Sequence, residues 1–253
     1  MEPAGIALLL GAGLLAGAVN AVAGGGSFVT FSALVASGLT PIEATATALL
    51  AIYPAGIAST AAYRAELLAN LNRFGVLTVI GLGFGAAGGW ALIQTGDTAF
   101  RAIVPWLLLF ATALFAAGPA IGGWLAKLAR QGEPGLTRRL GGLGLHSLAS
   151  FYGGYFGAGL GIVLLTTLTL TEGTAFHRIN AAKNLLALVI PVLAAAQLVF
   201  AGLVDWPRAA AIAGSGLIGG WYGVVLARHI PVWILRTFVL GTGASLTVWF
   251  FMQ

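Results

Sequence analysis

The chain has 253 residues, of which 59% are hydrophobic and only 8% are charged. Soluble domains carry about 25% charged residues, so this composition excludes a soluble globular protein and predicts an integral membrane protein. The formal charge of +5 comes from Lys and Arg residues spread over short links, which argues against nucleic acid as a partner. The absence of cysteine excludes disulfides and thiolate metal sites, and we expect no cofactor.

Apolar runs of the ~20 residues that a membrane-spanning helix needs recur from end to end. We therefore expect an all-α integral membrane protein whose partner is the lipid bilayer, with no separate soluble domain. The run from Ala4 to Val22 has no basic residue before it, so we expect a mature helix rather than a cleaved signal peptide. The eight expected helical elements span residues 4–37, 41–62, 74–93, 103–125, 140–171, 174–201, 206–226 and 232–251.

Two of these elements are interrupted by residues that disfavour helix, since each glycine costs about 1 kcal/mol in a helix interior. The first interruption consists of Gly24, Gly25, Gly26 and Ser27, and the second contains Gly157, Gly159 and Gly161. A shift of 135 positions superposes one on the other. Further along, after a slip of four positions, Gly83, Gly85, Gly88, Gly89 and Trp90 match Gly214, Gly216, Gly219, Gly220 and Trp221.

This ordered set of matches predicts two similar halves, each with four helical elements. We expect a first membrane repeat over residues 1–126, a charged linker over 127–139 and a second repeat over 140–253. Basic residues favour cytoplasmic termini if each interrupted element crosses the membrane once. If each one re-enters and leaves by the same face, the halves are inverted instead. The sequence leaves that choice open.

Individual prolines, charged residues and glycines predict where the expected helices begin, bend and pack. Pro41-Ile42-Glu43 predicts a helix start, and Pro54 and Pro191 predict kinks inside the second and sixth elements. Asp97 and Arg101 are expected to bound a turn. The four-residue spacing of Gly81, Gly85 and Gly89 predicts a flat strip against which another helix packs closely.

A helix interrupted in lipid leaves backbone N–H and C=O groups that only protein or a wet cavity can satisfy. Two equivalent interruptions therefore predict a shared central cavity. The half-helices that follow would direct their N-terminal N–H groups into it, an arrangement that favours an anion. The alternative is that these glycines serve only close helix packing.

Polar residues after the second interruption support an anion site. Asn180, Lys183 and Asn184 lie on one face of a helix, and Thr45 and Thr47 occupy the corresponding stretch of the first half. A lysine this deep in an apolar helix is expected to face a partner or a wet cavity, and it would hold an oxyanion by charge and hydrogen bonds. The alternative is a lysine that reaches to the membrane surface.

Other polar residues discriminate between mechanisms. His146 lies inside an apolar helix, where it is either a packing residue or a proton relay. The acids fall at predicted helix ends or links, so no intramembrane carboxylate of a cation pump is expected. No catalytic constellation is present, so we expect no enzyme. Coupling to H⁺ or Na⁺, or facilitated diffusion without coupling, stays open, and nothing indicates an oligomeric state.

The glycine-rich interruption followed by Thr45-Ala46-Thr47, the second one followed by Asn180-Ala181-Ala182-Lys183-Asn184, and the duplication resemble the sulfite exporter TauE/SafE family of bacterial membrane proteins. The resemblance implies movement of sulfite or sulfonates across the cytoplasmic (inner) membrane. It also implies a pocket formed by the residues of both interruptions with Thr45, Thr47, Asn180, Lys183 and Asn184. Ala48 stands where the second half has Lys183, so the two halves cannot bind equally.

The main hypothesis is therefore a secondary transporter that moves a small anion by alternating access about the two interruptions. The anion follows from the residues, and the sulfur follows from the resemblance alone. The alternative is a membrane partner that assembles or anchors a larger complex and transports nothing.

Overall fold

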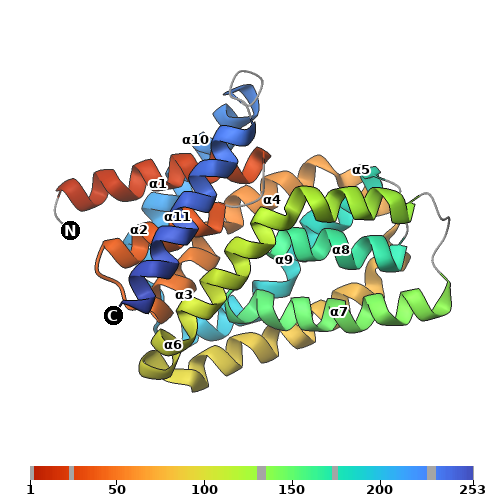
Figure 1. Ribbon diagram of the computed structural model, residues 1–253, viewed down its shortest axis with the longest axis horizontal. Coiled ribbons are helices and arrows are strands. Elements are labelled where there is room, and N and C mark those ends of the chain that lie inside the picture. Colours follow the sequence, from red (N-terminus) through yellow and green to blue (C-terminus); the bar gives the residue numbers. More distant parts are fainter. Residues whose placement is uncertain (1–2, 23–25, 130–134, 173–175, 227–231, 253) are drawn as a thin grey trace. The chain divides into compact units, whose positions relative to one another are not determined.

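The structure is a computed structural model that describes residues 3–22, 26–129, 135–172, 176–226 and 232–252. Every regular element within these ranges is an α-helix (Figure 1), which confirms the all-α prediction. The helices are α1 (Pro3–Val22), α2 (Gly26–Ala36), α3 (Pro41–Ala51), α4 (Tyr53–Ala62), α5 (Arg64–Ala69), α6 (Leu71–Ala129), α7 (Leu136–Tyr155), α8 (Leu160–Glu172), α9 (Phe176–Phe200), α10 (Trp206–Leu226) and α11 (Val232–Phe251).

Two stretches of these helices have the length and apolar character of membrane spans. Among the described residues, Phe74–Leu125 and Arg178–Phe200 are long and apolar enough to cross a membrane by length and composition alone. Shorter apolar stretches are Ala4–Asn20, Gly26–Ala36, Leu160–Glu172 and Thr237–Phe251. Each of them overlaps a predicted element, and Phe74–Leu125 covers the third and fourth predicted elements together with the residues between them.

The third and fourth predicted elements meet at a sharp turn inside α6. Gly96 has φ 68° and ψ 163°, a backbone conformation that is essentially restricted to glycine. We expected Asp97 and Arg101 to lie on either side of this turn. Instead, both follow it, in the second part of α6. There the Arg101 guanidinium donates to the Asp97 carboxylate at 2.9 Å across one helical turn.

The second predicted element is two helices rather than one kinked helix. α3 begins after Thr40, whose hydroxyl accepts from the N–H of Glu43 while the Glu43 carboxylate accepts from the N–H of Thr40. This capping box confirms the predicted helix start. α3 then ends at Ala51, and Pro54 lies in the first turn of α4, where its missing N–H removes no helical hydrogen bond. α9 instead continues through Pro191.

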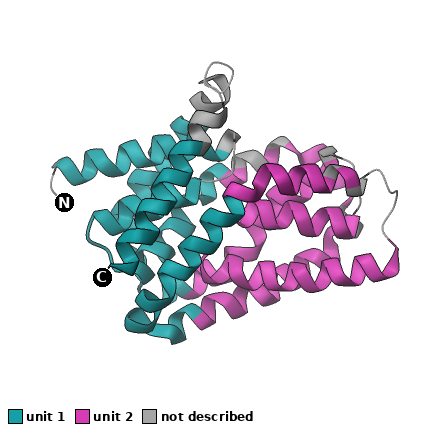
Figure 2. Cartoon of the chain, in the orientation of Figure 1, with its two compact units in different colours: residues 1–55, 92–115, 198–253 teal, residues 56–91, 116–197 magenta. Residues whose placement is uncertain are grey.

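The helices form two compact units (Figure 2). Unit 1 comprises residues 1–55, 92–115 and 198–253, and unit 2 comprises residues 56–91 and 116–197. Each unit therefore combines segments of both predicted repeats. The predicted linker, 127–139, lies inside unit 2 rather than between the units. A spatial grouping does not test a duplication in sequence, so the two repeats stay a prediction.

In unit 1, α1 and α10 pack with their backbones in close approach. A Cβ atom added at Gly17 would lie 2.1 Å from the carbonyl oxygen of Gly216, and one added at Gly219 would lie 2.1 Å from the carbonyl oxygen of Leu14. Only glycine permits this approach, because a carbon atom at such distances would overlap the facing backbone. We call this contact the unit 1 glycine seam.

Unit 2 contains a contact of the same kind between α7 and the first part of α6. A Cβ atom at Gly154 would lie 1.9 Å from the carbonyl oxygen of Gly85, and one at Gly88 would lie 2.1 Å from that of Phe151. We call this contact the unit 2 glycine seam. Gly85 also faces α9, where its Cβ position lies 2.0 Å from the carbonyl oxygen of Ile190. The predicted use of the glycine strip for close packing is therefore confirmed.

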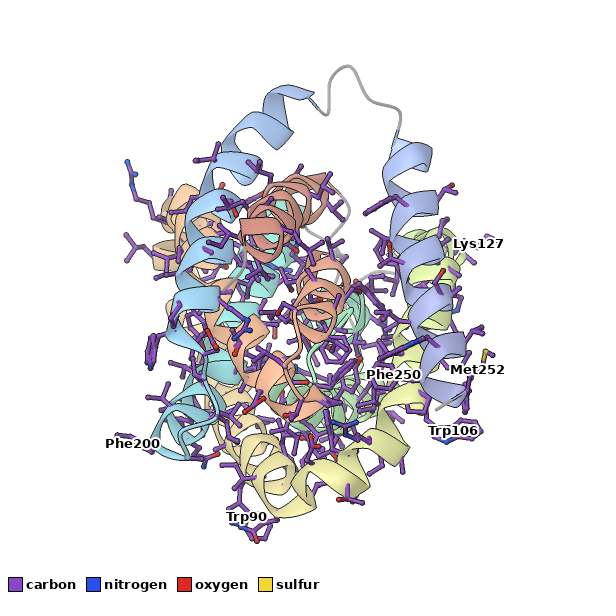
Figure 3. All side chains as sticks on the ribbon, turned by 90° about the vertical axis from the view of Figure 1, so that its left-hand side faces the viewer. Trp90, Trp106, Lys127, Phe200, Phe250 and Met252 are labelled. Atoms are coloured by element: carbon purple, nitrogen blue, oxygen red, sulfur yellow. The ribbon has the colours of Figure 1, made fainter. Side chains whose placement is uncertain are left out.

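Aromatic and aliphatic side chains form the buried interior of each unit. In unit 1, Phe28 packs edge-on against Phe115 with ring centroids 6.3 Å apart, and Phe31 packs against Phe250 at 6.4 Å. The Phe250 side chain is buried and turned toward neighbouring helices of unit 1. Trp106 and Met252 are exposed and lie at the outer edge of unit 1 (Figure 3). In unit 2, the buried cluster centres on fully enclosed leucines of α8 and α9, namely Leu164, Leu168 and Leu186.

Candidate functional site

The first predicted interruption lies between α1 and α2. Gly24 and Gly25 fall outside the described residues, whereas Gly26 is the first residue of α2. A Cβ atom at Gly26 would lie 2.4 Å from the carbonyl oxygen of Ala16, so glycine is needed where α2 starts against α1. Ser27 is half-buried, and its carbonyl oxygen accepts from the Thr30 hydroxyl at 3.1 Å.

The second predicted interruption is an ordered turn between α7 and α8. Gly157 and Gly159 both have φ 75°, which favours glycine. The Tyr152 hydroxyl donates to the carbonyl oxygen of Ala158 at 2.5 Å, and the Tyr152 carbonyl accepts from the N–H groups of Phe156 and Gly157. By contrast, a Cβ atom at Gly161 would meet nothing within 4 Å.

Two amides of this turn have no acceptor. No described residue accepts a hydrogen bond from the N–H of Ala158 or Gly159, and both residues are buried. A buried N–H without a partner costs about 1–3 kcal/mol, so such groups are normally satisfied by water or a ligand. The turn therefore presents two donors at the start of α8.

Thr45 and Thr47 of α3 are fully engaged within unit 1. The Thr45 hydroxyl donates to the carbonyl oxygen of Pro41 at 2.8 Å, and the Thr47 hydroxyl accepts from the N–H of Asp205 at 3.1 Å. Both threonines are buried. In this conformation their hydroxyl groups bond to backbone groups of unit 1. A role for the two threonines in solute binding stays a prediction.

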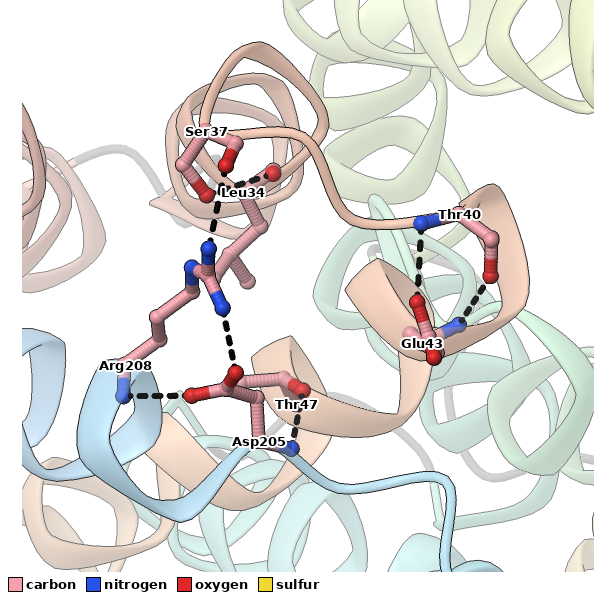
Figure 4. Close-up of polar contacts among 7 residues, drawn as sticks. All are labelled: Leu34, Ser37, Thr40, Glu43, Thr47, Asp205 and Arg208. Atoms are coloured by element: carbon pink, nitrogen blue, oxygen red, sulfur yellow. Dashed lines mark hydrogen bonds and ion pairs between the residues drawn. The ribbon is translucent and has the colours of Figure 1, made fainter. Parts of the chain in front are cut away.

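Asp205 and Arg208 extend this contact into a network at the start of α10 (Figure 4). One Asp205 carboxylate oxygen accepts from the N–H of Arg208 at 2.9 Å, and the other pairs with the Arg208 guanidinium. The guanidinium also donates to the carbonyl oxygen of Ser37, just past α2, at 3.1 Å. The network joins the end of α2, the middle of α3 and the start of α10. Sequence reasoning missed it, although an aspartate just before a helix is a recognisable N-cap signal.

In unit 2, the C-terminal turn of α8 binds two arginines. The Arg138 guanidinium of α7 donates to the carbonyl oxygen of Thr169 at 3.2 Å, and the Arg178 guanidinium of α9 donates to that of Glu172 at 2.5 Å. Cations at this end complement the negative end of the helix dipole. The sequence placed Glu172 at a helix end, which is correct, but the residue is also buried, with only 2% exposed.

Farther along α9, three predicted site residues lie on one face of the helix. Asn180, Lys183 and Asn184 are all half-buried. Asn180 already has an interaction partner. For Lys183 and Asn184, no hydrogen bond or ion pair joins either side chain to any residue in the described part of the chain. Two neighbouring polar groups thus stay available on this face.

His146 lies fully buried in α7. Its Nε2 atom is 3.0 Å from the carbonyl oxygen of Leu77 in α6, and its Nδ1 atom has no partner among the residues that the structure describes. Because a carbonyl oxygen only accepts, the hydrogen belongs on Nε2. The ring therefore links two helices of unit 2, as expected of a packing residue, and the proton relay stays a prediction.

The predicted site residues divide between the two units. Gly26, Ser27, Thr45 and Thr47 belong to unit 1, and Gly157, Gly159, Gly161, Asn180, Lys183, Asn184 and His146 belong to unit 2. Within unit 2, α9 supplies two side chains and the α7–α8 turn supplies two amides that have no partner among the described residues. No cluster of three or more His, Asp or Glu residues that could hold a metal ion occurs within the described ranges.

Comparison with known proteins finds one matching family model and several relatives. A family model described as "Sulfite exporter TauE/SafE" matches residues 9–250. A "Probable membrane transporter protein" of Haemophilus influenzae is 23% identical over 236 residues, which cover 93% of this chain and 90% of the relative. The "Probable membrane transporter protein YfcA" of Escherichia coli K12 is 27% identical over 205 residues, which cover 76% of this chain and 72% of the relative. No solved structure matches.

Proposed function

The chain belongs to the sulfite exporter TauE/SafE family, and on that premise we propose that it is a secondary transporter for a small anion, sulfite or an organosulfonate. Membership of this family, together with the relatives named as membrane transporters, makes it a multi-pass membrane transporter. The proposal goes further in naming the solute, the cytoplasmic (inner) membrane of a bacterium and a mechanism of alternating access.

The observation that carries the choice of an anion is the environment of Lys183. This side chain is half-buried on an apolar helix, about 10 Å from the start of α9, and no described residue neutralises it. An unpaired ammonium in a membrane segment is costly unless water or a counter-ion accompanies it. An oxyanion supplies both the charge and the hydrogen-bond acceptors, and the neighbouring Asn184 amide adds a donor.

The turn between α7 and α8 supports the same choice. Its two unpartnered amides stand at the N-terminus of α8, where the partial positive charge of the helix dipole also favours an anion. In lipid, backbone donors without protein partners require water or a solute. The proposal assigns that role to the transported anion and its water.

The proposed site in unit 2 consists of the α9 residues and the α7–α8 turn. Gly24, Gly25, Gly26, Ser27, Thr45 and Thr47 of the first half stay predicted binding residues. On this proposal the threonines of α3 contribute when unit 1 rearranges during transport. Coupling of the anion to H⁺ or Na⁺ belongs to the same proposal, with His146 as the group to examine for H⁺.

Transport in proteoliposomes tests the proposal. Purified protein should carry radiolabelled sulfite, and sulfonates should compete with it, under imposed proton or sodium gradients that identify the coupling ion. Lys183→Ala should abolish this flux while the protein stays folded in detergent. Lys127→Ala, which removes an exposed lysine of α6 in the same unit, is the matched control and should leave the flux unchanged. Normal sulfite flux in Lys183→Ala would remove Lys183 from the site.

The packing role of the glycine seams also fits the second hypothesis, a membrane partner that transports nothing. Single cysteines in this cysteine-free chain separate the two. Gly161→Cys is well suited, because a side chain there meets no other atom within 4 Å. A water-soluble thiol reagent should label it, and sulfite should slow the labelling. A residue that stays unlabelled in the folded protein would favour the non-transporting partner.

A further inference from the structure

The charges of the described side chains indicate which anions the proposed site accepts. Eight cationic Lys and Arg side chains are described, namely Arg64, Arg101, Lys127, Arg138, Arg139, Arg178, Lys183 and Arg208. Four of them are exposed: Arg64, Arg101, Lys127 and Arg139. Arg101 is also paired with Asp97.

The remaining four are half-buried, and three of these are already engaged. Arg138 and Arg178 donate to carbonyl oxygens at the end of α8. Arg208 is paired with Asp205 and donates to Ser37. Lys183 is therefore the only cation in the described part of the chain that is neither exposed nor bound to protein.

The nearest cation along α9 does not share the site. Arg178 precedes Lys183 by five residues, which corresponds to about 7.5 Å along the helix axis and to a different face of the helix. Its guanidinium is turned to the end of α8. The face of α9 that carries Asn180, Lys183 and Asn184 thus has a charge of +1.

We infer that the site selects solutes by charge and prefers a singly charged oxyanion, such as bisulfite or a monosulfonate, to a dianion or an uncharged analogue. The inference rests on the proposed function and adds the charge state of the solute to it. A monoanion brings the charge on this face of α9 to zero. A dianion leaves one uncompensated negative charge in a low-dielectric segment, and an uncharged sulfone leaves Lys183 uncompensated. Asn184 hydrogen-bonds each of them without distinguishing charge.

Competition for radiolabelled sulfite uptake by three probes of permanent charge tests this. The probes are 1-propanesulfonate (monoanion), 1,2-ethanedisulfonate (dianion) and ethyl methyl sulfone (uncharged), and mildly acidic pH keeps the substrate itself as bisulfite. We expect the monosulfonate to compete about tenfold better or more than the other two. This is the ratio that one favourable charge interaction commonly gives.

Two variants assign that preference to Lys183. Asn184→Asp places a carboxylate beside the lysine at nearly unchanged volume, and Lys183→Gln removes the cation. Both should lose the tenfold preference in binding, measured as ligand-induced thermal stabilisation in detergent. That readout also shows whether each variant is folded. Lys183→Arg keeps the charge and should keep the preference.

The outcomes are distinct. A monosulfonate preference that disappears in Asn184→Asp and Lys183→Gln supports the inference. If the disulfonate competes as well as the monosulfonate, or if the folded variants retain the preference, the inference is wrong while sulfite transport stands. If wild-type protein neither transports sulfite nor binds any sulfonate, the proposed function itself fails.

Discussion

Helix α3 of unit 1 and the first half of α9 of unit 2 correspond to each other in the predicted repeat. They differ in whether their polar side chains bond to described residues of the protein. In α3, Thr45 and Thr47 bond to Pro41 and Asp205 and lie buried. In α9, Lys183 and Asn184 are half-buried and bond to no described residue. Polar groups at places that the predicted repeat makes equivalent therefore bond within one unit and have no described partner in the other.

The two units agree, however, in how their helices approach one another. Gly17 against Gly216 in unit 1 matches Gly154 against Gly85 in unit 2, with Cβ positions 2.1 and 1.9 Å from the facing carbonyl oxygens. The distance of 2.1 Å also recurs at Gly219 and at Gly88. The predicted repeat, which stays a prediction, would place these two contacts at corresponding positions. The two units thus pack their helices in the same way but differ in their polar residues.

The largest expected effect comes from disrupting the unit 1 and unit 2 glycine seams. Gly154→Ala and Gly17→Ala each place a methyl group against a facing backbone carbonyl oxygen and should each lower the free energy of unfolding by about 3 kcal/mol or more, or prevent folding. Thermal unfolding in detergent measures this.

Matched controls lie two residues before the facing glycines, Gly85 and Gly216. A Cβ atom at Gly83 or Gly214 meets nothing within 4 Å, so Gly83→Ala and Gly214→Ala should be neutral or stabilising by about 0.5–1 kcal/mol. If Gly17→Ala were tolerated and Gly154→Ala were not, the units would not share one packing device.

A smaller effect should follow from removing the charged group that joins α2 and α10. Arg208→Gln loses a half-buried ion pair and the bond to Ser37, so we expect a loss of about 1.5–3 kcal/mol. Arg101→Gln breaks a similar pair with Asp97 that is mostly exposed and should cost about 0–1 kcal/mol. Chemical denaturation of both variants compares them. Equal losses would show that the network does not hold unit 1 together.

The smallest effect tests the comparison of α3 with α9 directly. Thr47→Val removes the acceptor of the Asp205 N–H and should cost about 1 kcal/mol of stability. Thr242→Val, which removes a hydroxyl bonded only within α11, is the control and should cost less. Transport by Thr47→Val, corrected for the amount of folded protein, should exceed that of Lys183→Gln. The reverse order would place Thr47, not Lys183, at the solute.

Local features of the chain were predictable because their causes lie within a few residues. The apolar composition determined a membrane protein built of helices. Thr40, Pro41 and Glu43 form a helix start from neighbouring groups alone, and the strip of Gly81, Gly85 and Gly89 marked a packing face. The candidate residues of α9 were also visible in the sequence, because a lysine inside an apolar run stands out.

The remaining features were decided by tertiary structure, because they depend on residues far apart in the chain. The bond between Thr47 and Asp205 joins residues 158 positions apart, and no local pattern reports such a contact. The same holds for the burial of Glu172 and for the way each unit draws helices from both repeats. Sequence alone determined which segments become helices and where polar groups are costly. Only packing decided which of those groups the protein satisfies itself, since burial and pairing are properties of the whole fold.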